Sequence, residues 1–378
     1  MSKKLLFVFK SPIINCPRPR RLALTLARQH DVNYLCPAEL NEAEYDNIKR
    51  YGYLYRTIQS PFMRKLTRLA VRCGWMSLAS RIAAGRFKMP EIKDGDFDYI
   101  FVHDLYLYPY FSDFSKTKII FDAREFYPLE MADDPHWKNT EGKLAEYTCR
   151  HYLNKPYKML TVSPSLVEMY RAMLKRKVLY FPSYPREELR VAAESKAISR
   201  PIRFIHHGVA LENRGLDRMI ELMRVLGNDY QLDLMLVPRL KGNYIATLKQ
   251  LAADLSNVNF IEPVHPDNIV DVCSRYDIGL YIMSINESQN RYCLPNKFFE
   301  FVFAGLPLIT SFSQDMKKLI DENKLGLGFL DESIEEIAAS IRKITPQDIT
   351  RFRHNVAENT RAWTTADNVR LNLPELHS

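Results

Sequence analysis

The sequence is poor in glycine, lacks paired cysteines and has no long apolar run. Its 13 glycines in 378 residues exclude a collagen-like or glycine-rich linker architecture. No apolar stretch is long enough to cross a membrane as a helix. The 6 cysteines are scattered and form no C-x-x-C pair, which argues against a zinc ribbon and against a disulfide framework. We therefore expect a protein of a reducing, cytoplasmic compartment.

Motifs for dinucleotide, phosphate and zinc binding are also missing. The sequence contains no G-x-G-x-x-G, no P-loop and no H-E-x-x-H, which disfavours a nicotinamide enzyme. Asp94, Asp96 and Asp98 have the D-x-D spacing of a divalent-cation site, but they precede an apolar run instead of following one. The Asp-Gly pair among them indicates a turn. We therefore expect a solvated turn at this position, no metal site and no cofactor.

Positive charge is concentrated in one segment. The formal net charge is +8, from 53 basic and 45 acidic residues. Ten basic residues and no acidic one lie between Lys49 and Lys88, so the rest of the chain has 43 basic against 45 acidic residues. The segment 49–88 therefore carries the whole excess of positive charge.

This basic segment has the pattern of an amphipathic helix. Arg64, Arg68 and Arg72 form a basic stripe beside apolar residues at helical spacing. A basic amphipathic helix with aromatic neighbours can lie on an anionic membrane, which is the first interpretation. A solvated face on an ordinary domain helix is the second, and nucleic-acid binding is disfavoured because no recognised module accompanies the charge. The apolar residues are Phe62, Leu66, Leu69, Cys73 and Met76.

Short apolar segments alternate with helix-like segments along the chain. This alternation predicts parallel sheets covered by helices on both faces, in two doubly wound α/β domains. A polar stretch flanked by prolines, 186–201, is expected to connect residues 1–185 to residues 202–350, with further helices over 351–378. Strands are expected at Leu5–Phe9, Val32–Leu35, Tyr99–Val102, Lys118–Phe121, Met159–Val162, Ile202–Ile205, Leu232–Val237, Val258–Ile261, Ile278–Ile282 and Leu306–Thr310.

The segment LPNKFFEFVFAGLPLIT, residues 294–310, carries the most specific chemistry. Asn296 can cap a helix that begins near Lys297, and Gly305 suits the C-terminus of that helix. Lys297 and Glu300 share one helix face, so phosphate at the N-terminus and two ribose hydroxyls at Glu300 would fit together. A nucleotide site is therefore one interpretation, and an ordinary capped helix with a solvated Lys–Glu pair is the other.

Within this segment, PNKFFEFVFAGLP resembles the P-x-K-x-x-E segment, ending in G-x-P, of retaining GT-B glycosyltransferases of the family-four type (glycosyl transferases group 1). FIHHGVALENRGLDRMIELM resembles the opening of their second domain, and IIFDAREFYP with MLTVSPSLVEMY resembles strands of the first. The resemblance covers nearly the whole chain. It implies two Rossmann-like domains facing a central cleft, with the acceptor bound by the first domain and a nucleotide-sugar by the second. It also implies C-terminal helices that cross back near Trp363.

The resemblance assigns a donor site to the second domain. Fixed positive groups beside the diphosphate would stabilise the leaving group without a metal, a catalytic role that suits Arg214, Lys297 and Arg124. Glu300 would hold the ribose. The expected donor-binding residues are Gly208, Arg214, Asn296, Lys297 and Glu300.

Other polar residues follow strands of either domain. His103, Asp104 and Glu125 come after first-domain strands and would bind the acceptor or position the sugar, or would only cap their loops. His206 and His207 end the first strand of the second domain, and we interpret them as structural.

Three departures from the family pattern keep alternatives open. Tyr292 stands where the family has the first acid of a glutamate pair, Val209 stands near the first of two basic residues, and Arg124 replaces a histidine. The alternatives are a nucleotide-sugar epimerase of the same architecture and a non-catalytic nucleotide-sugar-binding subunit. The leading expectation is a retaining glycosyltransferase (a hexosyltransferase) that uses a UDP-sugar, or next a GDP-sugar. Its acceptor would be a saccharide or a lipid-linked molecule in surface polysaccharide or glycolipid synthesis at the inner face of the plasma membrane.

Overall fold

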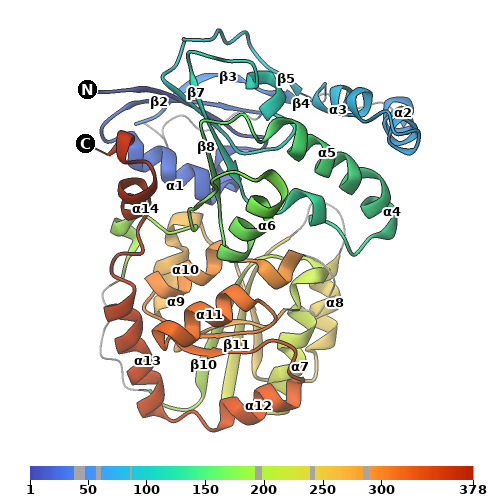
Figure 1. Ribbon diagram of the computed structural model, residues 1–378. Helices are drawn as coiled ribbons and strands as arrows, with labels where there is room; N and C mark the ends of the chain where they lie inside the picture. Colours follow the sequence, from blue (N-terminus) through green and yellow to red (C-terminus); the bar gives the residue numbers. More distant parts are fainter. Residues whose placement is uncertain are drawn as a thin grey trace. The chain divides into compact units, whose positions relative to one another are not determined.

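The computed structural model describes residues 1–37, 47–56, 61–85, 87–191, 198–238, 243–283 and 289–377. The chain forms two compact units (Figure 1). The first unit comprises residues 1–182 and the C-terminal residues from Thr365, and the second is formed by most of the residues between them. Each unit is built around one parallel sheet with flanking helices, so the predicted α/β class is confirmed.

The sheet of the first unit has seven strands in the order β3-β2-β1-β6-β7-β8-β9. Its central strands are buried apolar runs, which is typical of a parallel sheet covered on both faces. A separate pair, β4 (Tyr55–Arg56) and β5 (Phe87–Lys88), is antiparallel. The seven strands are β1 Lys4–Val8, β2 Asp31–Cys36, β3 Lys49–Tyr53, β6 Tyr99–Val102, β7 Lys118–Ala123, β8 Lys158–Thr161 and β9 Leu179–Tyr180.

Helix starts in the first unit follow local signals. The Ser163 hydroxyl accepts the N–H of Leu166 at 3.3 Å, and Pro164 occupies the first turn of α6 (Pro164–Leu174). The Ser-Pro-Ser sequence at 163–165 predicts a helix that starts at Ser163 or Ser165, and the structure places the cap at Ser163. The other helices are α1 Pro17–Leu26, α2 Pro61–Arg72, α3 Met76–Ala84, α4 Pro135–Trp137, α5 Lys143–Tyr152 and α14 Thr365–Asn372.

The C-terminal residues pack in the core of the first unit. Val369, Leu373 and Leu376 are buried in the same cluster as the apolar residues of β1 and β2. Helix α13 (Pro346–Asn359) belongs instead to the second unit, where it contacts α11 (Gln314–Asn323). Of the expected C-terminal helices, only α14 and the residues after it therefore lie with the first unit.

The expected connection over 186–201 is not a free linker at its start. The Arg190 guanidinium lies 4.1 Å from the centroid of the Phe303 ring and donates to the Thr360 carbonyl at 3.0 Å. Residues 183–191 consequently belong to the second unit, and the chain changes unit at Pro182, because these contacts fix the segment to that unit. Residues 192–197 of the expected connection lie outside the described residues.

The second unit contains a six-stranded parallel sheet in the order β12-β11-β10-β13-β14-β15. Strands β10 and β13 are neighbours at its centre, and their carboxyl ends face the same edge of the sheet. The strands are β10 Ile202–Val209, β11 Tyr230–Val237, β12 Val258–Ile261, β13 Ile278–Tyr281, β14 Leu308–Thr310 and β15 Gly326–Gly328. The helices not yet named are α7 Leu216–Leu226, α8 Tyr244–Leu251, α9 Ile269–Ser274, α10 Asn296–Phe303 and α12 Ile334–Arg342.

Candidate functional site

At the carboxyl end of β10, Gly208 leaves room for the amine of Lys297. Gly208 has φ +137°, a conformation that side chains other than glycine's rarely adopt. A Cβ at this position would lie 3.1 Å from Nζ of Lys297. The missing side chain therefore lets the lysine approach the backbone of β10.

Helix α10 lies directly on the sheet because β13 contains a glycine. A Cβ at Gly279 would overlap the ring of Phe301, so any larger residue would push the helix away. This close packing leaves Lys297 only 7% and Glu300 only 4% exposed. The solvated Lys–Glu pair considered from the sequence is therefore wrong.

The ends of α10 match the prediction in part. Pro295 is the N-cap residue and Asn296 is already the first helical residue, with no side-chain cap at this end. The predicted Asn296 cap is wrong, because the extended backbone that precedes the helix falls on Pro295. The predicted C-terminus is confirmed, since Gly305 has φ +72° and its N–H donates to Val302 at 3.0 Å.

The Lys297 amine is buried beside one cation, Arg214, and the Glu300 carboxylate also acts on it electrostatically. Its Nζ lies 3.2 Å from Nε2 of His206 and 4.2 Å from the centroid of the Tyr281 ring. Burial, followed by the charge of Arg214, holds the pKa of Lys297 well below its usual range. A bound anion would raise this pKa again, because its negative charge would stabilise the protonated amine.

His206 is locked in one neutral form. Its Nδ1 lies 2.8 Å from the carbonyl oxygen of Leu280, which can only accept, so Nδ1 carries the hydrogen. The free lone pair is then on Nε2 and accepts from Lys297. Burial and the adjacent lysine lower the pKa of His206 well below its usual range. The sequence alone does not predict the contact between His206 and Lys297. The only hint is that His206 lies two residues before Gly208.

Arg214 approaches the same tyrosine from the loop after β10. It ends a short 3-10 helix, Glu212–Arg214, and Gly215 at φ +66° then leads into α7. Its Nη1 donates to the Tyr281 hydroxyl at 3.3 Å. Lys297 and Arg214 therefore contact the face and the hydroxyl of a single ring, which the sequence analysis did not single out.

Glu300 lies one turn beyond Lys297 on α10. Its Oε2 is 3.4 Å from Nε2 of His207, the residue that follows His206 on β10. The ring of His207 also packs edge-on against Phe301, with centroids 5.2 Å apart. The structure thus brings Gly208, Arg214, Lys297 and Glu300 together around the carboxyl ends of β10 and β13, and places Asn296 at the N-terminus of α10.

A second polar cluster lies at the carboxyl ends of β6 and β7 in the first unit. The Arg18 Nε donates to Asp122 at 3.0 Å, and Nδ1 of His103 lies 3.1 Å from the same carboxylate. Although burial opposes ionisation, Arg18 and His103 hold the pKa of Asp122 well below its usual range. The carboxylate therefore fixes the hydrogen of His103 on Nδ1. Its Nε2 is buried and has no hydrogen-bond partner within the described residues.

The other predicted first-domain residues gather nearby. Asp104 forms an ion pair with Lys10 at 2.7 Å and accepts the N–H of Tyr106 at 3.0 Å, so it also stabilises its own loop. Burial opposes the charge of Arg124, but its neighbours, first Tyr127 and Cys16 and then Glu125 and Asp104, raise its pKa. The structure therefore brings His103, Asp104, Arg124 and Glu125 to one edge of the first sheet.

The first aspartate of the acidic turn before β6, Asp94, accepts hydrogen bonds from backbone N–H groups. The Asp94 carboxylate accepts the N–H groups of Ser115, Lys116 and Thr117 at 2.8, 3.0 and 2.9 Å. These bonds lower the pKa of Asp94 and tie its carboxylate to the loop that precedes β7. Across the described part of the chain, no group of three or more His, Cys, Asp or Glu side chains could hold a metal ion.

Helix α2 of the basic segment leaves two large apolar side chains exposed. Thr67, Ala70 and Val71 are buried, whereas Phe62 is 70% and Leu69 is 53% exposed. Phe62 and Leu69 of the expected apolar stripe therefore face outward, whereas Leu66 and Met76 are half-buried. The single helix expected for this stripe is wrong, because α2 ends at Arg72 and Met76 begins α3. The interpretation as an ordinary domain helix loses support, because such a helix would bury Phe62 and Leu69.

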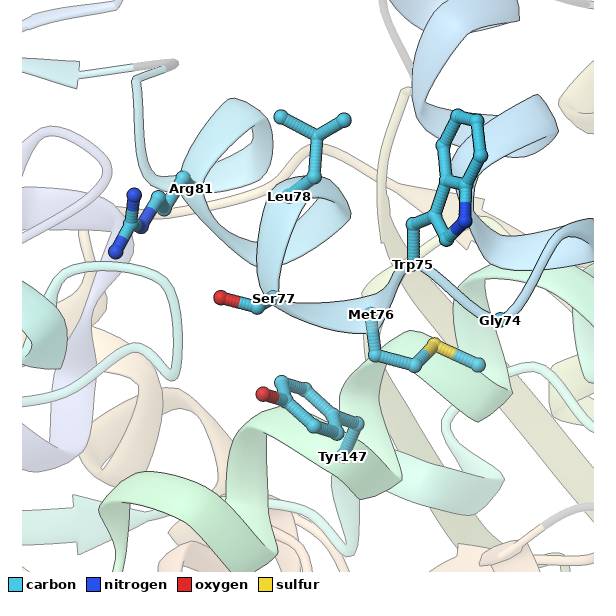
Figure 2. A pocket seen from close by; sticks show the side chains of 7 residues that line it. All are labelled: Gly74, Trp75, Met76, Ser77, Leu78, Arg81 and Tyr147. Atoms are coloured by element: carbon cyan, nitrogen blue, oxygen red, sulfur yellow. The ribbon is translucent and has the colours of Figure 1, made fainter.

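A hollow lies beside the turn that joins α2 to α3. It has a volume of about 540 Å³ and is lined by Gly74–Leu78, Arg81 and Tyr147. Trp75 is 58% exposed, and Figure 2 shows that Trp75 and Leu78 point away from Tyr147. This surface therefore combines an exposed aromatic ring and a leucine with an arginine. No helix within the described ranges is long and apolar enough to cross a membrane.

Comparisons with known proteins place this geometry in a fold family. Residues 234–370 match the sequence model of the family described as Glucosyltransferase 3-like, C-terminal domain. HepE of Anabaena, solved in complex with UDP and glucose, is similar over 99% of both chains, with a TM-score of 0.71 and 11% identity. The chain has the GT-B fold. The predicted fold is thereby confirmed.

Two more solved GT-B structures agree. Sucrose-phosphate synthase from Thermosynechococcus elongatus has a TM-score of 0.71 and 12% identity over 99% of this chain and 98% of its own. WaaG, a glycosyltransferase involved in lipopolysaccharide biosynthesis, has a TM-score of 0.64 and 12% identity over 97% of this chain and 99% of its own. No curated protein sequence matches this GT-B chain.

The matches bear out the predicted resemblance, since residues 234–370 are similar to a glucosyltransferase-like family model and the chain has the GT-B fold. Lys297 and Glu300 of this GT-B protein lie inside the matched residues 234–370, and Gly208 and Arg214 precede them. Their individual roles stay predictions.

Proposed function

We propose that this GT-B protein is a retaining glycosyltransferase that takes a sugar from a nucleoside diphosphate sugar. A UDP-sugar is the favoured donor and a GDP-sugar the next. The observation that carries the proposal is the pair of cations, Lys297 and Arg214, held around Tyr281 and next to the open backbone of Gly208. Within the described residues, no carboxylate lies within ion-pair distance of Nζ of Lys297, so this amine is available to an anion.

The reaction breaks the bond between the sugar and the diphosphate. Negative charge grows on the leaving oxygen, while the sugar carbon becomes positive. Arg214 and Lys297 would stabilise that growing charge more strongly than the charge of the bound donor. Burial strengthens their effect, because the surroundings screen charge less than water does. Glu300 would accept hydrogen bonds from the ribose hydroxyls and so fix the nucleotide.

The first-unit cluster would handle the sugar or the acceptor. Asp122 holds the hydrogen of His103 on Nδ1, which leaves Nε2 to accept a hydrogen bond from a hydroxyl. Asp104, Arg124 and Glu125 follow the same strand ends. We propose a saccharide or a lipid-linked acceptor of surface polysaccharide or glycolipid synthesis.

A transfer assay tests the function directly. The protein is incubated with UDP- and GDP-sugars, with and without candidate acceptors, and the products and their anomeric configuration are identified. A new glycoside with the donor's configuration is the expected product. A changed sugar on the nucleotide without any acceptor would favour the epimerase, and nucleotide binding without turnover would favour the non-catalytic subunit.

Activity is expected to survive removal of divalent cations. Arg214 and Lys297 supply the positive charge that a metal would otherwise bring to the diphosphate. Turnover is measured before and after extensive treatment with EDTA. Activity that disappears with EDTA and returns with magnesium or manganese would refute a metal-independent mechanism.

We further propose that the basic segment lies on anionic membranes. Phe62, Leu69 and Trp75 are exposed, and basic side chains surround them. Apolar side chains that enter the headgroup region and cations that meet lipid phosphates would act together there. A membrane position would also suit a lipid-linked acceptor.

Reversing the charge of α2 is expected to abolish binding to anionic vesicles. Arg64, Arg68 and Arg72 are changed together to Glu, since each basic residue near such a surface contributes about 1 kcal/mol. Co-sedimentation with anionic and neutral vesicles is measured at low and high salt, and affinity for UDP is expected to stay unchanged.

A matched control applies the same charge change to the second unit. Lys249, Lys318 and Lys343 are exposed there and are replaced together by Glu. This control is expected to sediment with vesicles as the parent does. Equal binding by the α2 variant and the parent, or no binding by the parent at low salt, would leave a solvated face as the explanation.

A further inference from the structure

One buried titratable group in the second unit has no role in the mechanism proposed above. His206 is 1% exposed and lies on β10 between a backbone carbonyl and the Lys297 ammonium. A residue whose only purpose was to fill the core would need no polar atoms at this position. Both ring nitrogens of His206 instead have a partner.

His206 is the donor in one of its two hydrogen bonds and the acceptor in the other. The Leu280 carbonyl accepts the Nδ1 hydrogen at 2.8 Å and thereby sets both the tautomer and the plane of the ring. Nε2 then presents a lone pair to Nζ of Lys297 at 3.2 Å. The Leu280 carbonyl of β13 therefore orients the imidazole ring, and the ring in turn fixes the position of Nζ of Lys297.

A neutral acceptor suits this position better than a carboxylate. A carboxylate at 3.2 Å would neutralise the ammonium and compete with a diphosphate for it. The imidazole holds Nζ without adding negative charge. The Tyr281 ring, Arg214 and the backbone of Gly208 also lie near Nζ. The Glu300 carboxylate favours the charged amine electrostatically but forms no ion pair with it among the described residues.

We propose that His206 is a positioning residue that holds Lys297 Nζ beside Gly208 for the diphosphate of the donor. This proposal rests on the donor site proposed above. A flexible lysine would otherwise lose rotamer freedom when the donor binds, and a lysine that is already held loses less. The effect therefore appears in donor affinity and turnover, and not in the fold.

Two single substitutions separate the two contacts of the ring. His206→Asn places an amide near the Nδ1 position, where it can still donate to Leu280 but cannot reach Lys297. His206→Gln places an amide oxygen near the Nε2 position, where it can accept from Lys297 without the Leu280 contact. We expect His206→Asn to weaken UDP binding about tenfold and His206→Gln to stay within about threefold of the parent.

Calorimetric titration with UDP measures both variants, and thermal unfolding verifies that each is folded. A merely structural histidine would give the opposite order, because the anchor to the sheet would then matter more than the lysine. Equal affinities of Asn, Gln and parent proteins, or a larger loss with Gln than with Asn, would overturn the proposal.

A double-mutant cycle with Lys297→Met tests whether His206 changes UDP affinity only through Lys297. If His206 acts only through the lysine, His206→Asn changes UDP affinity less than twofold in the Lys297→Met background. Additive losses would overturn the positioning role. A parent protein that binds neither UDP nor GDP would overturn the donor site itself, so the two failures are distinguishable.

Discussion

Replacing Lys297 by methionine is expected to lower turnover about 100- to 1000-fold while the protein stays folded. The lysine is buried next to Arg214, with an imidazole as its hydrogen-bond acceptor and no carboxylate in ion-pair distance among the described residues. A methionine of similar length fills the same space without the cost of burying an amine. The measurement is kcat at saturating donor, with Lys318→Met on the exposed face of α11 as the control. Unchanged kcat in Lys297→Met would remove this residue from the reaction.

Proton uptake on donor binding gives a second measurement that should distinguish Lys297→Met from the parent. Burial and the charge of Arg214 hold the pKa of Lys297 well below its usual range. A bound diphosphate raises that pKa by adding negative charge. Between the two pKa values the amine takes up a proton on binding, so donor affinity falls as the pH rises through this window. Calorimetry in buffers of different ionisation enthalpy measures the uptake, and an equal uptake by Lys297→Met would contradict its assignment to this amine.

The sequence predicts the central strands well because burial on both faces leaves a clear apolar run. The central strand Tyr99–Val102 is found with the predicted limits, and so is the apolar strand Val258–Ile261 at one edge of the second sheet. The edge strands β3 (KRYGY) and β15 (GLG) were not predicted. Their residues carry no such run, and each becomes a strand only because a neighbour, β2 or β14, offers its hydrogen bonds.

The site is predictable to the extent that helical spacing fixes it. Lys297 and Glu300 share a face of α10, as their separation requires. The partner of Lys297 comes from β10, 91 residues earlier, and no local pattern connects the two. The sequence therefore indicates only a structural role for His206, since the tautomer that makes it an acceptor depends on the Leu280 carbonyl of a neighbouring strand.

The basic segment shows a different limit. Periodicity locates α2 correctly but does not identify its buried face, because the residues that pack inward include the small or polar Thr67 and Ala70. The larger Phe62 and Leu69 are left outside. Hydrophobic spacing alone does not decide whether the larger residues face the core or the surface, because that depends on tertiary packing.

Replacing Glu300 by alanine is expected to weaken binding of the nucleoside diphosphate about ten- to hundredfold. The reason is the loss of hydrogen bonds from two ribose hydroxyls to a charged acceptor, about 1.5–3 kcal/mol in total. The decisive comparison uses UDP and its 2′,3′-dideoxy analogue, which lacks both hydroxyls. The parent should prefer UDP strongly, and Glu300→Ala should bind the two alike.

The contact of Glu300 with His207 supplies the competing explanation. Its Oε2 lies 3.4 Å from Nε2 of His207, so the carboxylate could serve only to pair with this buried ring. In that case Glu300→Ala would lower the melting temperature, and UDP would still be preferred over the dideoxy analogue by the parent's ratio. His207→Phe is the matched control, because it removes the polar partner and keeps an aromatic ring against Phe301. If Glu300 binds the ribose, the preference for UDP survives in His207→Phe and is lost in Glu300→Ala; the same preference in both variants would exclude Glu300 from the donor site.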